Sequence, residues 1–549
     1  MKYLSVILLA AALIAGFTHC QTDATQSRGL EEITIDTTEF DRHMRVLASD
    51  EFLGRKPFTE GETKTIAYLK NELEKMGIEP GNQGSYFQEV PLVEITPTPD
   101  PVMRVQSPKG NFELAIKDDY VIYSEREQER IEVQDAEVVF CGYGIVAPEY
   151  GWNDYEGIDM KGKIALVMVN DPGFQNETAD STFFKGNIMT YYGRWTYKYE
   201  EAARQGAAGV LIIHETNAAG YPWFVPRGSL NPRLNLQTPD AGMRKCAIQG
   251  WVTLTTAAEL FRNATVEGGR FFERAQTPGF KPIPLGLRIS TGLSNRMKKD
   301  VSQNVVGLIR GSKRPDETII YSAHWDHLGV GQPVQGDSIY NGALDNASGT
   351  SALLAIAKAF TKMKNRPERS VVFLFVTAEE QGLLGSEHYA KNPIFAVDKT
   401  VANINMDGMN PNGPMRDLTV VGFGQSELDD YASEEAGRQG RYILPDQEPE
   451  KGFYFRSDHF NFAKVGIPAL YASGGYDHMT EGKEYARSRA DDFTAKRYHQ
   501  PSDKYLPELW VLSGVAQDAQ LYFNIGRRLA NETTFPKWKD GSEFKALRD

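Results

Sequence analysis

Cysteine is scarce in this sequence, and only Cys20, Cys141 and Cys246 occur among its 549 residues. A structural zinc site made of four thiolates is excluded, because it needs more cysteines than the chain has. Cys141 and Cys246 could pair in an oxidising compartment, but a sequence does not reveal connectivity. A four-coordinate metal site in this chain must therefore include other residue types.

Positive charge is in deficit as well. The chain has 60 Lys and Arg against 73 Asp and Glu, a formal net charge of −13, and no basic run. Nucleic acids and anionic membrane surfaces are therefore poor candidates for partners. The contents of hydrophobic residues, 41%, and of charged residues, 24%, are ordinary for a globular protein.

Long hydrophobic runs are missing after the first residues. Residues 1–20 hold Lys2 followed by LSVILLAAALIAGF, which is too short to span a bilayer and has the layout of a secretory signal. Cys20 follows this run and could carry a lipid anchor, although the preceding FTH departs from the small residues of a lipoprotein signal. We expect an exported protein without a transmembrane span, either periplasmic, anchored at the outer membrane or extracellular.

Several common catalytic motifs are also absent. HETNA at His214 lacks the second histidine of an H-E-x-x-H zinc motif. The sequence has no G-x-S-x-G elbow, no P-loop and no G-x-G-x-x-G that opens a helix. These absences disfavour serine hydrolases, nucleotide-binding enzymes and Rossmann dehydrogenases.

The chain does contain a pair of acidic residues after a strongly apolar segment. In SVVFLFVTAEEQGLLG, residues 370–378 carry no charge, and Glu379 and Glu380 follow before a glycine-rich turn. The apolar run predicts a core strand of an α/β sheet, and such sheets bind ligands at the carboxyl ends of their strands. Burying two adjacent carboxylates is costly unless cations or protons compensate, so the pair indicates a metal site.

Other hard ligands occupy similar positions along the sequence. His324, Asp326 and His327 end one predicted strand, and Asp407 ends another. Asp345 stands in a turn before a predicted helix, and His499 lies far downstream. Carboxylates and imidazoles without thiolates suit Zn²⁺, and suit Mn²⁺ or Co²⁺ less well.

The length of the chain indicates more than one domain. Strands alternate with helices from about residue 304, which predicts a largely parallel, doubly wound α/β sheet. Residues 111–284 have short strands and many Gly, Pro and aromatic residues, as a separate small α+β domain would. We expect a signal peptide at 1–20, followed by the first part of a catalytic domain at 30–110 and an insert at 111–284. The main part of the catalytic domain would follow at 285–530, and a loose polar tail at 531–549.

The order of these motifs resembles the co-catalytic zinc peptidases of family M28, the clan of aminopeptidases and glutamate carboxypeptidases. In this chain the motifs are His324-Trp325-Asp326, Asp345, Glu379-Glu380, Asp407 and Tyr498-His499. Residues 111–284 resemble a protease-associated (PA) domain, notably in GYGIVAPEYGWNDYEGIDMKGKIALV and YEEAARQGAAGVLII. The resemblance implies a zinc exopeptidase fold with an inserted domain, two Zn²⁺ ions per chain and peptide substrates.

The resemblance also implies a role for each residue. The zinc ligands would be His324 with Asp407 for one ion, Glu380 with His499 for the other, and Asp345 as the bridge. Glu379 would act as the general base, and Asp326 would hold the free ring nitrogen of His324. Tyr498 could donate its hydroxyl to the tetrahedral oxyanion.

Three other histidines compete for these roles. His327 shares the HWDH segment, and His478, in GGYDHMTEG, is an alternative to the ligand furthest downstream. His459, in RSDHFNF, is expected to form loop hydrogen bonds near the site together with Ser457 and Asp458.

The leading hypothesis is a zinc-dependent exopeptidase that acts as an aminopeptidase. The first alternative is a carboxypeptidase for acidic C-terminal residues, which needs arginines for two carboxylates. Arg416, Arg456 and Arg497 are candidates by sequence proximity. The second is a non-hydrolytic zinc enzyme that cyclises N-terminal glutamine. The complete ligand set disfavours a binding protein without metal, and the oligomeric state stays open.

Overall fold

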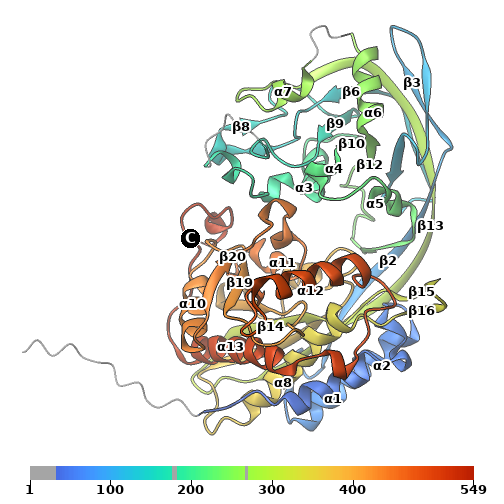
Figure 1. Cartoon of the computed structure of the whole chain (residues 1–549). Helices are drawn as coiled ribbons and strands as arrows, with labels where there is room; N and C mark the ends of the chain where they lie inside the picture. Colours follow the sequence, from blue (N-terminus) through green and yellow to red (C-terminus); the bar gives the residue numbers. More distant parts are fainter. Residues whose placement is uncertain (1–31, 176–181, 266–269, 549) are drawn as a thin grey trace, which may run out of the picture.

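The computed structural model describes residues 32–175, 182–265 and 270–548, which form two regions (Figure 1). The main region contains both ends of the described chain. The insert region, residues 100–292, lies above it in Figure 1. The expected signal peptide and Cys20 fall outside the described residues.

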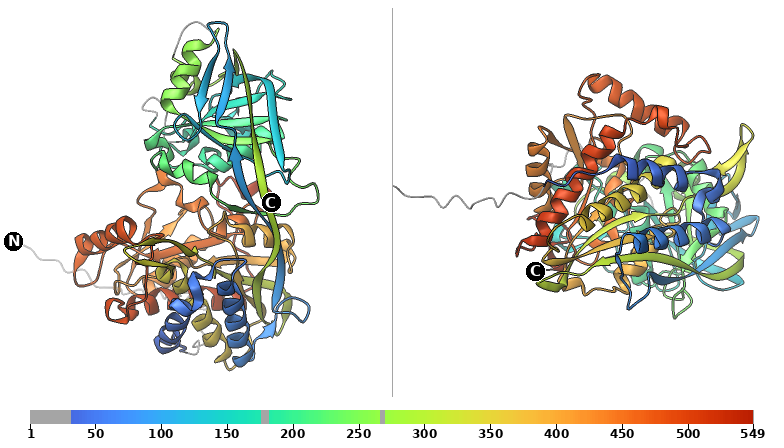
Figure 2. Two further views of the ribbon diagram at one scale, coloured as in Figure 1. Left: turned by 90° about the vertical axis from the view of Figure 1, so that its right-hand side faces the viewer. Right: turned by 90° about the horizontal axis from the view of Figure 1, so that it is seen from below.

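A two-stranded antiparallel ribbon connects the two regions. β2 (Phe87–Pro99) pairs along its whole length with β13 (Ile283–Ile309). β13 continues past the ribbon at both ends and joins the sheets of the two regions. Figure 2 shows both strands running along one side of the molecule. The ribbon therefore fixes the edge of the main region from which the insert region rises.

The main region is built on a mixed sheet whose centre is parallel. In spatial order its strands are β13, β17 (Arg369–Val376), β14 (Arg314–His324), β18 (Thr400–Asn405), β21 (Ala469–Gly474), β19 (Asp417–Val421) and β20 (Tyr442–Pro445). The strands from β17 to β21 are parallel, whereas β13 and β19 run antiparallel to their neighbours in this central group. The expected α/β class with a largely parallel sheet is confirmed.

The central strand β17 is buried on both faces, as its sequence predicts. All of its residues, RSVVFLFV, are buried. Because side chains alternate along a strand, they enter two different cores: Val371, Phe373 and Phe375 one, and Val372, Leu374 and Val376 the other. Each such side chain stabilises the fold by about 1.5–3 kcal/mol. Charge is therefore confined to the ends of this strand.

Helices cover both faces of the main sheet. α1 (Thr37–Leu47), α8 (Ser348–Thr361) and α13 (Leu512–Asn531) share one core on the face turned away from the insert region, where Figure 2 shows them in blue, yellow and red. α9 (Leu384–Lys391) and α11 (His459–Ala463) contribute to the core on the other face. The carboxyl edge of the sheet stays accessible between these layers.

The insert region has a sheet and cores of its own. In spatial order its strands are β4 (Phe112–Ala115), β3 (Val102–Gln106), β13, β6 (Arg130–Phe140), β9 (Ile164–Met168), β10 (Gly209–His214), β12 (Ile248–Thr253) and β5 (Tyr120–Tyr123). α3 (Trp195–Arg204) and α6 (Leu254–Asn263) pack into its cores. Cys141 and Cys246 are both buried and free, so the pairing left open by the sequence does not occur here. The domain boundaries and the PA assignment stay predictions.

The last described residues correct one expectation. The sequence predicts a loose tail from residue 531, but Trp538 and Phe544 are buried, and Nε1–H of Trp538 donates to O of Gly466 at 2.9 Å. The segment is mostly polar, but it contains these two large aromatic residues, and their burial attaches the segment to the main region. In the described part of the chain, no helix is both long enough and apolar enough to cross a membrane.

Candidate metal centre

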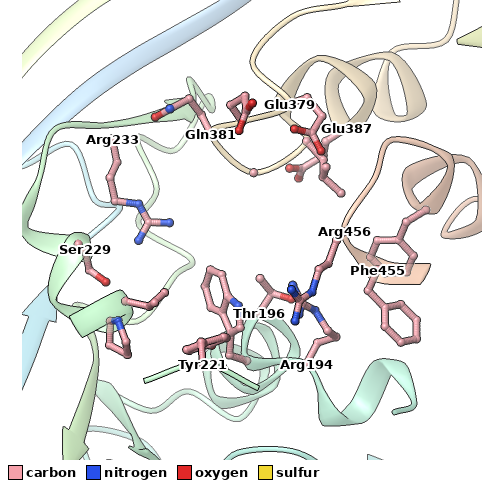
Figure 3. A pocket seen from close by; sticks show the side chains of 18 of the residues that line it. Arg194, Thr196, Tyr221, Ser229, Arg233, Glu379, Gln381, Glu387, Phe455 and Arg456 are labelled. Atoms are coloured by element: carbon pink, nitrogen blue, oxygen red, sulfur yellow. The ribbon is translucent and has the colours of Figure 1, made fainter. Parts of the chain in front are cut away.

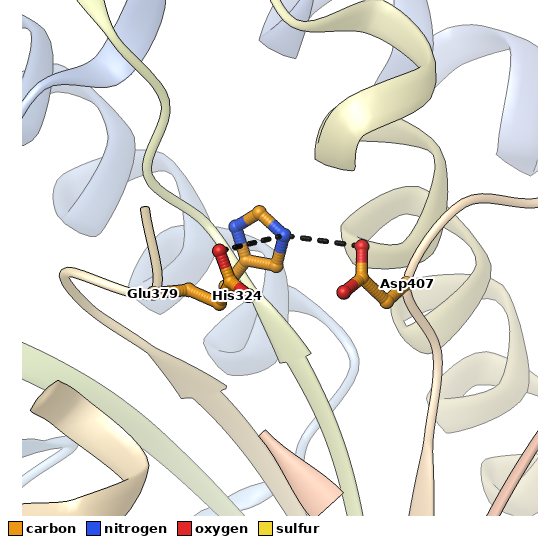
Figure 4. Close-up of side chains that lie close together, drawn as sticks. All are labelled: His324, Glu379 and Asp407. Atoms are coloured by element: carbon orange, nitrogen blue, oxygen red, sulfur yellow. Dashed lines mark hydrogen bonds and ion pairs between the residues drawn. The ribbon is translucent and has the colours of Figure 1, made fainter. Parts of the chain in front are cut away.

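Acidic residues and histidines meet at the carboxyl edge of the main sheet. His324 is the last residue of β14, and Glu379 and Asp407 follow the ends of β17 and β18 (Figure 4). Since these strands are adjacent and parallel, their ends bring the side chains together. Asp345 comes from the turn before α8, and His499 comes from a turn far downstream.

Asp345 stands between two groups of side chains. Its Oδ1 lies 3.2 Å from Nε2 of His324, and its Oδ2 lies 3.2 Å from Nε2 of His499. Oδ1 of Asp407 lies 3.3 Å from the same nitrogen of His324. Oε2 of Glu380 lies 3.1 Å from the same nitrogen of His499. All five side chains predicted as zinc ligands therefore converge, and one carboxylate faces both groups.

The donor atoms of this cluster fit divalent cations. Two sets of donor atoms each lie within 4.8 Å of one another: His324, Glu379 and Asp407 in one, and His327, Asp345 and Glu380 in the other. These sets include Glu379 and His327, which were not predicted as ligands, and leave out His499, which was. Nε2 of His499 is buried and forms no hydrogen bond with the described residues, although two carboxylate oxygens lie 3.1 and 3.2 Å from it. Several carboxylates packed together at this depth need positive charge beside them. Imidazole and carboxylate donors are the set that zinc prefers when thiolates are absent.

Electrostatics separates the two adjacent glutamates. Burial raises the pKa of Glu379 well above its usual value, with the imidazole of His324 acting against this shift and neighbouring carboxylates adding to it. Burial also opposes ionisation of Glu380, but His499 and His327 lower the pKa of this carboxyl group to about 2. The first group can therefore hold a proton, whereas the second stays ionised as a ligand must.

A sequence profile described as "Peptidase family M28" matches residues 304–523, which include all five converging side chains. We call these matched residues, 304–523, the M28 domain. The chain is 36% identical over 268 residues to "Aminopeptidase NAALADL1" of Mus musculus, covering 45% of this chain and 32% of that protein. It is 24% identical over 408 residues to "Glutamate carboxypeptidase 2 homolog" of Caenorhabditis elegans, covering 66% of this chain and 48% of that protein. The chain thus spans about a third to a half of these relatives.

A solved structure agrees with the fold of the chain. "Aminopeptidase from Aneurinibacillus sp. strain AM-1" aligns with a TM-score of 0.50 and 18% sequence identity, covering 91% of this chain and 96% of that one. At this identity the likeness concerns the fold alone.

Within the M28 domain, Asp326 holds its neighbours through two different atoms. Nδ1 of His324 lies 3.1 Å from the main-chain O of Asp326 and 3.7 Å from its Oδ1. Because a carbonyl only accepts, Nδ1 carries a proton and Nε2 faces the cluster. The main-chain carbonyl is thus closer to His324 than the carboxylate expected for this role. That carboxylate accepts the backbone N–H of Glu379 at 3.0 Å.

Sequence reasoning missed three contacts that fix ligands of the M28 domain. Oδ2 of Asp503 accepts the backbone N–H of Asp345 at 3.2 Å. Ser457 donates its hydroxyl to Oδ2 of Asp407 at 2.6 Å, and Tyr471 donates to the main-chain O of Asp407 at 3.1 Å. No sequence signal marks Asp503 or Tyr471, because both contacts depend on loop conformation. Through RSDHFNF the sequence predicts loop hydrogen bonds near the site for Ser457, but not its bond to Asp407.

The competing histidines occupy different places. Nδ1 of His327 lies 2.5 Å from Oε1 of Glu380, and Oε2 of Glu380 faces His499. His327 therefore lies within ligand reach and can also orient Glu380. His478 lies outside both donor groups, and its Nδ1 accepts a backbone N–H just before α12 (Gly482–Lys496). His459 is buried outside both groups as well, and neither ring nitrogen forms the expected hydrogen bond with the described residues.

A pocket of about 630 Å³ opens beside the centre, between the M28 domain and the insert region (Figure 3). Glu379 and His499 line one wall, together with Tyr498, which is 49% exposed. The ring of Tyr498 stacks on that of His499, with centroids 3.9 Å apart. The insert region supplies aromatic residues to the opposite wall: Tyr123, Trp195, Tyr221 and Trp251. The candidate centre therefore faces a space large enough for a short peptide.

Two arginines line the same pocket with N–H groups that lack a hydrogen-bond partner among the described residues. Arg194 comes from the insert region and Arg456 from the M28 domain (Figure 3). Nε of Arg194, and Nε and Nη2 of Arg456, are buried without a hydrogen-bond partner among the described residues. Burial and the charge of Arg456 lower the pKa of Arg194 to about 10. Arg416 and Arg497 do not line this pocket. Unpaired guanidinium groups in such a wall can bind a carboxylate.

Proposed function

We propose that the chain is an exported, zinc-dependent exopeptidase whose leading activity is that of an aminopeptidase. The observation that carries this proposal is Asp345, whose two oxygens each lie 3.2 Å from a different imidazole, that of His324 or that of His499. A carboxylate shared between two groups of ligands supports a pair of metal ions. The names of two relatives, an aminopeptidase and a glutamate carboxypeptidase homolog, support peptide-bond hydrolysis.

The residues of the cluster divide into two zinc sites in this proposal. His324 and Asp407 would hold one ion, Glu380 and His499 the other, and Asp345 both. Bound zinc would lower the pKa of a water molecule and polarise the scissile carbonyl. The proton on Nδ1 of His324 leaves Nε2 free to bind, since Nδ1 faces the carbonyl of Asp326 at 3.1 Å.

Glu379 is the proposed general base. Its Oε2 lies 3.9 Å from Nε2 of His324, close to the centre but further than the ligand oxygens. The raised pKa of this carboxyl group lets it take a proton from the attacking water and pass it to the leaving amine. The bond from its backbone N–H to Asp326 keeps the residue in place for both transfers.

Tyr498 is the proposed donor to the oxyanion. Its stack on His499 holds the ring beside the centre. The residue is half-exposed, but the partial burial of its hydroxyl group and the nearby carboxylates raise the pKa of that group above the usual value. The hydroxyl therefore keeps its proton at neutral pH and can donate a hydrogen bond to developing negative charge.

The insert region would restrict access to the centre. It contributes aromatic side chains and Arg194 to the pocket, which leaves room for short or unfolded peptides. Its assignment as a PA domain and the export of the chain rest on the sequence.

One observation favours a carboxypeptidase as the second candidate. Arg194 and Arg456 present unpaired N–H groups in the pocket that contains Glu379. A substrate bound by its C-terminal carboxylate would satisfy these donors and extend toward the zinc site.

Four versions of one short peptide separate the two candidates, with the N-terminus free or acetylated and the C-terminus free or amidated. Zinc-loaded protein acting as an aminopeptidase requires the free N-terminus and accepts the amide. Loss of hydrolysis on amidation alone identifies the carboxypeptidase, and Arg194→Met then raises KM for the free acid, with Arg233→Met from the same pocket as control. Failure of the zinc-loaded protein to hydrolyse any version overturns the proposal.

A further inference from the structure

The segment that follows α13 packs against a loop of the metal centre. We infer that residues 537–547, the brace segment, position residues 453–461, the site loop, for the reaction. Trp538 and Phe544 would be positioning residues that act through this loop on Ser457 and Arg456. The inference rests on the proposed function for the reaction, but the loop itself can be followed without it.

Aromatic contacts join the brace segment to the site loop. The ring of Phe544 stacks with that of Tyr454 at a centroid distance of 6.0 Å and meets that of Phe460 at 6.2 Å. Trp538 lies behind Phe544, with ring centroids 5.2 Å apart. These residues share one small core, separate from the cores of the main sheet. The site loop therefore depends on the brace segment for much of its packing.

The brace segment has attachments of its own to the main region. Nε1–H of Trp538 donates to O of Gly466 at 2.9 Å. The backbone N–H of Lys539 donates to O of Gln425 at 2.9 Å, and the backbone carbonyl of Lys537 accepts from Glu427 at 2.9 Å. The segment is thus fixed independently of the site loop and can serve as a rigid support.

A continuous series of contacts leads from Phe544 to a predicted zinc ligand. Tyr454, which stacks on Phe544, lies against His459 at a centroid distance of 4.7 Å. His459 lies 5.0 Å from the ring of Tyr471, whose hydroxyl donates to the main-chain O of Asp407 at 3.1 Å. These rings are closely packed, so a displacement of Tyr454 would displace His459 and Tyr471 and thereby the main chain of Asp407.

The site loop also holds the predicted ligand directly. Ser457 donates its hydroxyl to Oδ2 of Asp407 at 2.6 Å and accepts from Nδ2 of Asn405 at 2.7 Å. The preceding residue, Arg456, enters the pocket. Hydrogen bonds of this length tolerate little displacement, so the loop position governs both the ligand and the pocket wall.

The opposite side of the site loop rests on the insert region. The ring of Tyr191 lies 5.0 Å from that of Phe460 and 6.0 Å from that of Phe455. The brace segment reaches the insert region too, through Glu543, whose Oε2 lies 3.3 Å from Nζ of Lys185. The loop is thereby held between two supports, and the brace segment is the one fixed to the main region.

Phe544→Ala tests the inference against Phe535→Ala. Phe535 precedes the brace segment, packs on the core of the main sheet and has Arg369 over its ring at 4.8 Å. Both variants remove one phenyl ring from the same stretch of chain, but only Phe544 touches the site loop. Phe544→Leu, which keeps apolar volume, is the second variant in case the alanine variant fails to fold.

Hydrogen exchange of residues 453–461 is the readout that needs neither metal nor activity. We expect faster exchange in Phe544→Ala and Phe544→Leu and unchanged exchange in Phe535→Ala. Zinc affinity, measured by chelator competition, should fall about 10- to 100-fold in Phe544→Ala, as when outer partners of ligands are removed. The kcat/KM of the folded fraction should fall by a similar factor, about 10- to 100-fold.

Equal exchange, zinc affinity and kcat/KM in the Phe544 and Phe535 variants would overturn the inference and leave the proposed function standing. If wild-type protein binds no zinc or hydrolyses no peptide, the proposed function fails. The exchange of the loop then still decides whether the brace segment positions it.

Discussion

Asp503 accepts the backbone N–H of Asp345 at 3.2 Å, and its two oxygens accept that of Leu344 at 3.0 and 3.1 Å. These bonds hold the turn that presents the carboxylate of Asp345 to both histidines. The residue acts on the centre without being one of the predicted ligands.

Replacing Asp503 by asparagine should loosen this turn, because the amide group of asparagine faces one of the N–H donors with a donor of its own. We expect zinc affinity to fall about 10- to 100-fold, as for other partners of ligand groups. Chelator competition measures the change. Asp337→Asn is the control, because Asp337 forms a partly exposed ion pair with Lys504 at 2.7 Å. Equal affinities in the two variants would remove this role from Asp503.

Glu379→Gln should retain zinc and lose turnover. The substitution keeps the shape of the side chain but removes the carboxylate that accepts the proton, so kcat should fall about 10²- to 10⁴-fold. Peptide hydrolysis and metal analysis of the same preparation measure both effects. Glu387→Gln changes another acid in the same pocket and should be nearly neutral. Turnover like that of wild type in Glu379→Gln contradicts the assignment.

Tyr498→Phe should lower kcat with little change in KM. The ring stack on His499 is retained, while the donor to the oxyanion is lost, which costs about 100-fold in comparable enzymes. Steady-state kinetics on one peptide gives both constants. Tyr442→Phe removes the hydroxyl of another exposed tyrosine, which donates to Asp477, and serves as control. A rise in KM at constant kcat would assign Tyr498 to substrate binding.

The buried His43, which lies away from the metal centre, should make the stability of the protein sensitive to acid. Burial, with the charge of Arg42, lowers its pKa from 6.5 to about 4, and its Nδ1 lies 2.7 Å from the hydroxyl of Tyr68. The unfolded chain therefore binds the proton more tightly. The contribution to stability is complete above pH 6.5 and is lost as the pH falls toward 4. At pH 5 the loss should be about 2 kcal/mol.

Urea unfolding of metal-free protein between pH 7.5 and 5 measures this loss. His43→Asn, which cannot titrate, should unfold with a shallower dependence on pH than wild type. The same slope in both proteins would show that the acid sensitivity arises elsewhere.

The sequence predicted the parts of the centre that depend on strand order. The uncharged run 370–378 gave a buried strand, β17, and parallel neighbours bring His324 and Asp407 to the same edge as Glu379. Local pattern suffices there, because a buried strand must change to polar residues where it ends. His324, Glu380 and Asp407 converge for this reason, whereas Asp345 and His499 reach the same edge from turns. The roles of all five as ligands stay predictions.

The sequence could not predict contacts made between distant loops. The pairing of His327 with Glu380 and the bond from Asp503 to Asp345 depend on how turns fold over the sheet edge. Proximity in sequence also misled the choice of candidate arginines for a carboxypeptidase. Arg456 lines the pocket together with Arg194, which lies far away in the sequence, in the insert region. Such pairs become visible only once the two regions are placed.

The composition of the last residues misled in another way. Residues 531–549 are rich in Lys, Asp and Glu, which is typical of a loose tail. Two aromatic residues, Trp538 and Phe544, are enough to fix the segment, because their large apolar surfaces enter a core shared with the site loop.

The zinc content of the protein tests the central claim most directly. After loading with zinc and dialysis, elemental analysis against protein concentration should give two ions per wild-type chain. Asp345→Asn should hold one or none, because both groups of ligands lose the carboxylate they share. A wild-type chain that retains one zinc ion or none, or an Asp345→Asn chain that retains two, would contradict the account.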